Sequence, residues 1–564
     1  MTSRGLLLSR RGFLRAGTGA IALGSVALAA ACSPNLPTGN PAAAVSGARN
    51  AAVQLPTHVP LAGLTPDLPG TADARIDPFF VNYPANPLKT VQETPGQGDT
   101  ISAVTWTTSP LPPPLDSNML WQAVNKALGV TLTVNIQAFA DYQQMKLPTL
   151  IAGNDLPDIV YIAPNSLIPQ FPAFVKSKMA DLTPYLSGDA IKEYPNLANM
   201  PTIAWRQMVF NNAIYGVPCP TSLYLWVHWL QQDLLDAEGL SRPATADDYR
   251  QLAFHFTRPD QGMYGLGAEK DVALGMTNGW ITGIFGTPNL WQLDGGSGKL
   301  TYMAETEQFR AALGYARDLW AGGAYHPDAM QYNLVSARND FAARKFMFRM
   351  DAFAVASAMF WATESHMNPP GNPQVLPPFA AAAGGTPPYW TTNGILGFSV
   401  LKQAPPDRIK EILRVMNWLA APLGTQEYLL MTYGLKDVHW TPDANGNPIL
   451  NDRGKAESTV PFQYLTRGTY AQYWPATPQN SPLMYGVQKA IEPYLTFNPT
   501  DPYHSETNQS KAPLLTKDLV DRMNDIILGR QRFSALDDAV KNWQSSGGDQ
   551  IRQEYEQAIA ATHA

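Results

Sequence analysis

Cysteine is scarce in this chain, with Cys32 and Cys219 the two examples among 564 residues. Two cysteines cannot build a disulfide framework, which excludes the scaffolds that depend on such cross-links. The surroundings of Cys32, described below, indicate that it is consumed by another chemistry. We therefore expect Cys219 to remain a lone thiol that is buried in the fold.

A basic block is also missing. The chain has 40 Lys and Arg against 46 Asp and Glu, which gives a formal net charge of -6 at pH 7. A nucleic-acid-binding protein needs a cationic surface to neutralise phosphates, and this composition offers no such surface. The sequence therefore predicts no nucleic-acid partner.

Catalytic and metal-binding motifs are absent as well. The sequence contains no HExxH, no GxSxG and no Cys-His metal spacing, and its eight His form no obvious triad. The run DGGSGK at residues 294–299 departs from a phosphate-binding loop, because Leu293 replaces its first glycine and Leu300 its Ser/Thr. We interpret this run as a hairpin turn. The sequence predicts no enzyme, no cofactor and no metal site.

Apolar residues, in contrast, are plentiful. Hydrophobic residues make up 45% of the chain and aromatic residues 10%, including 14 Trp and 23 Tyr. This is enough to fill a core and to leave rings for a ligand surface. Since 564 residues exceed what one hydrophobic core usually supports, we expect a globular protein with two or more packed units.

The N-terminus carries an export signal. Residues 9–14 read SRRGFL, which follows the twin-arginine pattern S-R-R-x-F-L, and an apolar run covers residues 20–31. This run is shorter than the ~20 residues that a membrane-spanning helix needs, and no second candidate span follows. Residues 1–32 are therefore predicted to be a signal peptide.

Small residues lead directly into Cys32, and the sequence Ala-Ala-Cys-Ser resembles a bacterial lipobox, with Ala29 where Leu is usual. A lipobox cysteine is diacylated and becomes the new N-terminus, and each buried acyl methylene adds ~0.8 kcal/mol of membrane affinity. The resemblance implies an anchor at the extracytoplasmic face of the bacterial cell membrane. The alternative is an ordinary cleaved signal, with Cys32 removed or left as a free thiol.

The segment after the signal peptide has a different composition. Residues 33–98 are dense in Pro, Ala, Gly and Thr and lack sustained periodicity. Such composition is typical of a flexible linker, so we expect a tether that lets a folded body stand away from the lipid.

Beyond this segment strands and helices alternate. Residues 101–105 form a short β-branched run, residues 119–128 have helical periodicity, and residues 130–136 again have a strand pattern. Residues 147–152 are predicted to form a helix and residues 158–162 a buried strand. Because parallel strands need crossover helices, the alternation predicts an α/β protein with a mostly parallel sheet and helices on both faces.

Several segments match, in order, the motifs of one protein family. The run LIAGNDLPDIVY at residues 150–161 is similar to an "ASGDLPDI" signature, and IYGVP at residues 214–218 is similar to "YGIP". Further matches are residues 225–252, ending in GLSRPATADDYRQL, then YGLKDVHW at 433–440 and WQSSGGDQIRQEY at 543–555. Over almost all of residues 99–563 the chain resembles the family 1 extracellular solute-binding proteins, the sugar-binding lipoproteins of bacterial ABC importers.

This resemblance implies a type II periplasmic-binding-protein-like fold, in which two lobes, each a mainly parallel sheet flanked by helices, enclose a ligand cleft. It places residues 99–220 and 391–434 in lobe 1, and residues 221–390 and 435–564 in lobe 2. Some relatives carry an acidic calcium loop. The corresponding residues 258–265 have one carboxylate, so we expect no calcium there.

Ligands of open α/β sheets bind beyond the carboxyl ends of the strands, so the residues that follow predicted strands are the candidates. A sugar needs aromatic platforms for its C-H faces and polar side chains for its hydroxyls. The candidate ligand residues are Trp106, Asn165, Ser166, Tyr224, Trp226, Asp351, Trp390, Asn393 and Trp440.

Each candidate also has a structural interpretation. Trp106 can be a core residue, and Asn165 with Ser166 can form a turn or cap a helix. Asp351 matches a family segment that faces ligand, but it can equally cap a helix over residues 352–362. His228 stands where the family usually has Arg, which weakens the transfer of roles at that position.

Three hypotheses follow. The first is a lipid-anchored, monomeric binding protein that captures a mono- or oligosaccharide and delivers it to ABC transporter permease subunits. The second is an exported carbohydrate-processing enzyme, which would need two carboxylates ~5 to ~9.5 Å apart across the cleft. The third is a surface interaction or sensor protein that keeps the fold without transport.

Overall fold

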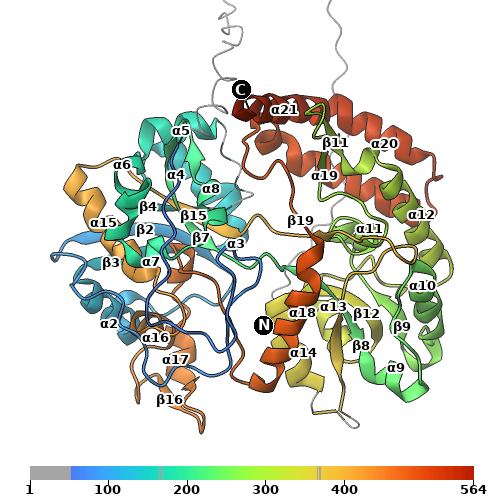
Figure 1. The fold of residues 1–564 in the computed structure, drawn as a ribbon, viewed down its shortest axis with the longest axis horizontal. Helices are drawn as coiled ribbons and strands as arrows, with labels where there is room; N and C mark the ends of the chain where they lie inside the picture. The colour runs from blue at the N-terminus through green and yellow to red at the C-terminus, as the bar shows by residue number, and fades with distance from the viewer. Residues whose placement is uncertain are drawn as a thin grey trace, which may run out of the picture. The chain divides into compact units, whose positions relative to one another are not determined.

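The computed structural model describes residues 53–163, 166, 168, 170–364, 366–367 and 370–563. The predicted signal peptide with Cys32, and the candidate Asn165, lie outside the described residues. Two larger β-sheets, each flanked by helices, organise the described part of the chain (Figure 1). This confirms the predicted α/β fold with helix-flanked sheets.

The first sheet has five strands in the order β3-β2-β4-β15-β7. We call this sheet and the helices packed around its core lobe 1. The strands are β2 (Thr100–Thr107), β3 (Thr131–Ala138), β4 (Ile159–Ile162), β7 (Gly216–Pro220) and β15 (Ile395–Leu401). The main helices are α2 (Met119–Leu128), α4 (Leu147–Gly153), α5 (Phe171–Lys178), α8 (Thr202–Arg206), α15 (Pro406–Leu419), α16 (Gln426–Tyr433) and α17 (Asp452–Glu457).

The second sheet has four strands in the order β13-β8-β12-β9 and defines lobe 2. The strands are β8 (Trp226–Gln231), β9 (Tyr264–Gly267), β12 (Phe346–Ala352) and β13 (Pro373–Leu376). The main helices are α9 (Gln232–Glu238), α10 (Ala246–His255), α11 (Ile281–Ile284), α12 (Glu307–Ala321), α13 (Leu334–Ala342), α14 (Phe353–Glu364), α18 (Ser481–Ile491), α19 (Glu506–Ile527), α20 (Ala535–Trp543) and α21 (Asp549–His563).

Both sheets are mixed, whereas the sequence predicts mainly parallel sheets. In lobe 1, β2 is parallel to β3 and β4, but β15 is antiparallel to β4 and β7. In lobe 2, β12 is parallel to β9 and antiparallel to β8. The physical reason is that β15 and β8 each enter their lobe from the other lobe, so they begin at the edge where neighbouring strands end.

The predicted βαβ opening is confirmed, and its local chemistry explains the boundaries. Helix α2 begins because Asn118 accepts a hydrogen bond from the backbone N of Trp121, and it ends at Gly129, whose φ of 67° suits glycine. All four residues of β4 are buried, as expected for a central strand covered on both faces. The run at residues 294–299 joins β10 (Trp291–Leu293) to the antiparallel β11 (Leu300–Tyr302), as predicted.

Residues 53–98 do not behave as the predicted tether in the described region. Phe79, Phe80 and Tyr83 are buried, and β1 (Phe79–Phe80) pairs with β18 (Gln472–Tyr473). The prediction from composition is wrong here, because a segment rich in Pro and Gly can pack on a folded surface when its backbone groups find hydrogen-bond partners there. We call residues 53–98 the N-terminal arm.

A second difference concerns the predicted lobe 2 segment at residues 435–564. Its first part packs on lobe 1, because Val460, Phe462 and Leu465 belong to the same buried core as β2 and α2. The side chain of Glu457 accepts a hydrogen bond of 3.1 Å from the backbone N of Leu120 in α2. Residues 435–465 therefore complete lobe 1. Strand and helix patterns in the sequence do not encode which lobe such a segment packs on.

Within the described residues, three segments cross between the sheets: residues 221–225, 377–394 and 466–505. Backbone hydrogen bonds tie the first two together, from Thr221 N to Gly394 O at 3.0 Å and from Thr392 N to Leu223 O at 3.2 Å. We call these three crossing segments the hinge.

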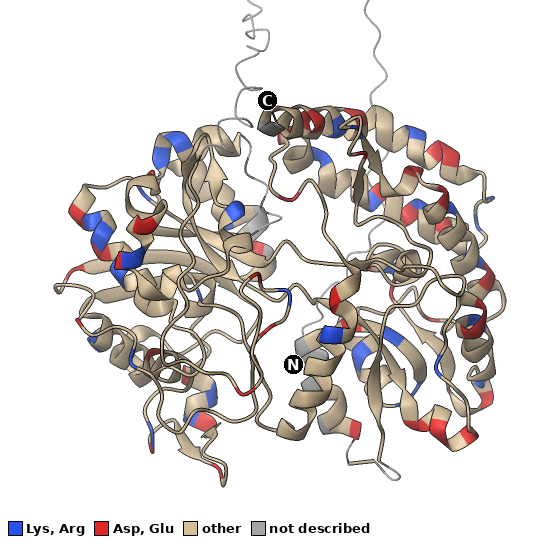
Figure 2. Cartoon of the chain, viewed as in Figure 1, with Lys and Arg blue, Asp and Glu red and all other residues tan. Residues whose placement is uncertain are grey.

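Charged side chains of both signs are mixed over the described part of the chain, in agreement with the nearly balanced numbers of basic and acidic residues in the sequence. Figure 2 shows Lys and Arg interspersed with Asp and Glu along the helices of both lobes. No helix in the described region has the length and apolarity required to cross a bilayer.

Candidate functional site

The two sheets turn corresponding edges toward the hinge. In lobe 1 the carboxyl ends of the parallel strands β2, β3 and β4 meet at one edge, and β15 begins there, with Ile395 opposite Pro220. In lobe 2, β12 ends with Ala352 opposite Trp226, the first residue of β8. Strand ends from both lobes therefore gather at the crossing segments, the position where ligands of such sheets bind.

A cavity of about 680 Å³ lies between these lobes. Ala163 lines it from the end of β4 in lobe 1 and Asn393 from the second crossing segment, while Trp291, Asp501 and Tyr555 line it from lobe 2 and the third crossing segment. Pockets that hold small organic ligands are ~300 to ~1,000 Å³, so this cavity can take a sugar unit or a short oligosaccharide.

Aromatic rings form one wall of the cavity. Phe171 and Phe210 are 5.0 Å apart between ring centroids, and Phe210 and Phe398 are 5.8 Å apart in a stacked arrangement. His504, also in the wall, lies 6.4 Å from Phe171. Such rings offer the apolar, quadrupolar faces on which sugar C-H groups pack.

Asp501 supplies a titratable group to the same cavity. The Asn498 amide donates to its Oδ1 at 2.8 Å, yet burial raises the pKa of the Asp501 carboxyl to about 7. Below that pH the carboxyl is protonated and can donate a hydrogen bond to a sugar oxygen, and above it the carboxylate accepts from a sugar hydroxyl.

A second cavity, of about 770 Å³, adjoins the first and shares Asn508 and Gln509 of α19 with it. Ser166 is its lining residue from lobe 1, and the Gln509 amide donates to the Ser166 carbonyl at 3.1 Å. Its charged lining residues are evenly matched, namely Lys270, Lys517 and Arg530 with Asp271, Asp521 and Asp525.

Trp226 and Trp390, two predicted ligand residues, line a third pocket within lobe 2 together with His228 and Phe379. Its volume of about 30 Å³ admits ordered water and no sugar ring. Burial lowers the pKa of the His228 imidazole to about 4, so this ring is neutral near pH 7. The structure thus brings these predicted residues together beside the hinge, in a pocket that this conformation leaves narrow.

Trp106, the predicted platform in lobe 1, is buried with 7% of its surface exposed. Its ring stacks on Tyr464 at 4.5 Å and lies 4.6 Å from Phe139, which is 44% exposed. Phe139 directly follows β3, at the edge of the sheet where the parallel strands end, and lines none of the three cavities described here. The exposed ring at this edge is therefore Phe139, with Trp106 as its support, and the missed signal was an aromatic residue at the end of the predicted second strand.

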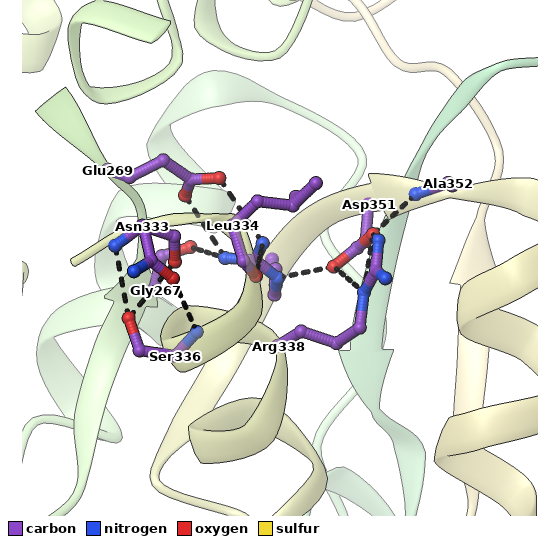
Figure 3. Close-up of polar contacts among 9 residues, drawn as sticks. Gly267, Glu269, Asn333, Leu334, Ser336, Arg338, Asp351 and Ala352 are labelled. Atoms are coloured by element: carbon purple, nitrogen blue, oxygen red, sulfur yellow. Dashed lines mark hydrogen bonds and ion pairs between the residues drawn. The ribbon is translucent and has the colours of Figure 1, made fainter. Parts of the chain in front are cut away.

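Asp351 belongs to a buried network of ion pairs and does not face a cavity described here (Figure 3). Its carboxylate accepts from Arg349 Nε at 2.7 Å, from Arg338 and from the backbone N of Ala352 at 2.7 Å. Arg349 reaches on to Glu269 at 3.2 Å. Both Asp351 oxygens already have donors, so the geometry places this carboxylate in the buried network rather than in direct ligand contact.

The remaining predicted residues fall in different places. Tyr224 is buried at the hinge, where its hydroxyl donates to the carbonyl of Arg75 at 2.5 Å. Asn393 lines the 680 Å³ cavity. Trp440 begins β16 (Trp440–Pro442) and donates to the Gly434 carbonyl at 3.1 Å, and it lines none of the three cavities described above.

The region that the structure describes contains no candidate metal site. No three or more His, Cys, Asp and Glu side chains gather there in an arrangement that could hold an ion.

Two mixed sheets joined by crossing segments, with cavities between strand ends, define the fold of the ABC-transporter substrate-binding proteins. The S. pneumoniae substrate-binding protein FusA, solved in complex with kestose, superposes with a TM-score of 0.57 at 18% identity. The match covers 82% of this chain and 99% of that one.

Two proteins of Bacillus subtilis (strain 168) are similar in sequence. The chain is 24% identical over 436 residues to the polygalacturonan/rhamnogalacturonan-binding protein YtcQ, covering 73% of this chain and 82% of YtcQ. It is 22% identical over 488 residues to the lipoprotein LipO, covering 82% of this chain and 93% of LipO. No protein-family model matches the chain.

Proposed function

We propose that this protein is an extracytoplasmic solute-binding lipoprotein that captures a carbohydrate between its lobes and delivers it to an ABC importer. The observation that carries the proposal is the cavity of about 680 Å³ at the strand ends, with a wall of aromatic rings beside polar groups. The names of FusA, YtcQ and LipO, proteins of similar fold or sequence, support the same conclusion.

In this proposal, aromatic and polar residues of the cleft have different roles. Phe139 and the ring cluster around Phe210 pack on the C-H faces of the sugar, while Asn393, Asp501 and Ser166 hydrogen-bond its hydroxyls. Trp226 and Trp390 join the site when the lobes move and the pocket beside the hinge widens. The protein holds the sugar and breaks no bond.

Membrane attachment and transport partners follow from the same proposal. Cys32 carries the lipid anchor after twin-arginine export, and the protein acts as a monomer at the outer face of the cell membrane. The closed, sugar-bound form is what the permease subunits recognise, because closure brings surfaces of both lobes into one fixed arrangement.

The test is a thermal-shift screen of the protein lacking residues 1–32, against mono- and oligosaccharides that include galacturonans and fructans. A ligand at about 100 times its Kd adds ~2.7 kcal/mol of stability. A raised Tm for one sugar class, with the sugar recovered intact by mass spectrometry, is the expected result. Hydrolysed sugar would favour the enzyme hypothesis, and a flat panel would favour a surface interaction or sensor protein.

A further inference from the structure

The N-terminal arm is fastened to lobe 1 at both of its ends. Near its start the backbone N of Val59 donates to the Ala198 carbonyl at 2.8 Å. Near its end the backbone N–H groups of Thr90 and Val91 donate to Glu427 Oε1 at 2.9 and 2.8 Å. Between these attachments the arm leaves the lobe 1 surface and reaches the hinge.

The part that reaches the hinge is a hairpin over residues 68–79. Leu68 and Phe79 exchange backbone hydrogen bonds of 3.1 and 2.9 Å, and Thr71 N donates to Ile76 O at 3.0 Å. We call residues 68–79 the hinge hairpin. Phe79 anchors it, since its fully buried ring lies 5.6 Å from Trp474 in the third crossing segment.

Asp77 of the hinge hairpin is 3% exposed and joins segments that are far apart in sequence. Its Oδ2 accepts from Ser222 Oγ at 2.6 Å, from Gln472 Nε2 at 2.8 Å and from Gln488 Nε2 at 2.7 Å. Its own backbone N donates to Gln488 Oε1 at 2.9 Å. Ser222 belongs to the first crossing segment, whereas the two glutamines belong to the third.

Gln488 connects this cluster to lobe 2. It lies on α18, whose buried residues Met484 and Val487 share a core with Phe353 and Trp361 of α14. The first crossing segment is also held, because Tyr224 donates to the Arg75 carbonyl in the hairpin. One carboxylate therefore links an arm fixed to lobe 1, a crossing segment and a helix packed on lobe 2.

Loss of the Asp77 acceptor would be costly for the structure around it. A buried carboxylate that loses its donors, or buried donors that lose their acceptor, cost the full desolvation of those groups. The four hydrogen bonds require one mutual placement of the hairpin, the crossing segment and α18. A change in the angle between the lobes has to preserve or break that placement.

We propose that the hinge hairpin sets the resting angle between the lobes and that Asp77 is its positioning residue. Asp77 lines none of the three cavities described above. It acts by holding the first crossing segment and α18 against an arm that belongs to lobe 1, so it decides how far the empty protein opens.

The experiment measures the lobe angle directly, without ligand. In the protein lacking residues 1–32, and therefore lacking Cys32, Lys126→Cys in lobe 1 and Lys541→Cys in lobe 2 place spin labels on exposed positions. Burial raises the pKa of the Cys219 thiol to about 12, so this thiol does not take up label in the folded protein. Pulsed electron spin resonance then gives the distribution of interlobe distances.

Asp77→Ala is expected to shift or broaden this distribution, and Ser222→Ala to do so in part. Asp77→Asn keeps an acceptor oxygen and should restore the wild-type distribution. The matched control is Asp73→Ala, on the same hairpin, whose side chain is 63% exposed. If Asp77→Ala and Ser222→Ala fold and leave the distribution unchanged like the control, the inference is wrong. If Asp77→Ala does not fold, Ser222→Ala alone decides.

A second readout rests on the proposed function. Once a sugar is identified, its Kd should change by about fivefold or more in Asp77→Ala, because binding draws on the lobe equilibrium. At saturating sugar the label distances of the variant and the wild type should coincide. A shifted distance in the empty protein together with no sugar binding at all would keep the hinge inference and overturn the sugar-binding function.

Discussion

Arg349 and Asp351 lie two residues apart on β12, on the same face of the strand, and pair at 2.7 Å with both side chains fully buried. Period-two alternation puts them side by side, and Glu269 and Arg338 extend the pair into a four-residue network. Burial raises the pKa of Glu269 despite the nearby Arg349 guanidinium. The cleft edge of lobe 2 is thus held by charges that are satisfied internally.

Removing Arg349 should be strongly destabilising. Arg349→Met leaves Glu269 and Asp351 with fewer donors in a buried place, and breaking such a network costs about 3–5 kcal/mol of unfolding free energy. Urea unfolding followed by tryptophan fluorescence measures the loss. The control is Lys345→Ala, which breaks a half-exposed pair with Asp340 and should cost less than about 1 kcal/mol. Equal losses in both variants would contradict the assignment.

Phe139 should matter for binding and little for stability. Its ring is 44% exposed at the cleft edge, so Phe139→Ala is expected to weaken sugar binding by about tenfold, or ~1.4 kcal/mol, with a nearly unchanged Tm. Isothermal titration calorimetry measures the affinity. Phe139→Tyr keeps the ring and should bind normally.

Trp106 should show the opposite behaviour. Its ring is buried between Tyr464 and Phe139, so Trp106→Ala opens a cavity and should cost about 3–5 kcal/mol of stability. Chemical denaturation measures it. A Phe139→Ala protein that binds as tightly as the wild type, or a fully stable Trp106→Ala protein, would reverse the roles given to these two rings.

Asp501 should make stability depend on pH. Its pKa rises from the ordinary 3.8 to about 7 on folding, because burial disfavours the carboxylate. The folded protein holds the extra proton, so the stability that Asp501 contributes is present below about pH 4 and is lost as the pH rises through about 7. Asp501→Asn removes this effect. The Tm of the variant relative to the wild type should therefore increase from pH 5 to pH 8, and a constant difference would refute the assignment.

Cys219 should be inert in the folded protein. It is buried in β7, and burial raises the pKa of its thiol to about 12, so almost no thiolate exists near pH 7. Ellman's reagent is expected to react within minutes in denaturant and negligibly without it. The sample is the protein lacking residues 1–32, because Cys32 is then absent. A rapid reaction of the native protein would contradict the prediction and would show that the sheet opens at β7.

The local elements could be predicted from the sequence, because turn residues, caps and periodicity act over short distances. The helix at residues 119–128 lies between Asn118 and Gly129, and the strand at residues 158–162 follows a Gly and Pro break, as predicted. The α/β class, the buried Cys219 and the hairpin turn at residues 294–299 also follow from such signals.

Which residues come into contact could not be predicted in this way, because it depends on packing between distant parts of the chain. Trp106 lies near the end of β2 and Phe139 directly follows β3, and packing against Tyr464 buries the Trp106 ring whereas the Phe139 ring stays exposed. Asp77 lies in a segment whose composition indicates a tether, yet its donors come from residues 222, 472 and 488. Hydrogen bonds and core contacts between residues hundreds of positions apart leave no periodic trace in the sequence, so the hinge became visible only after folding brought its parts together.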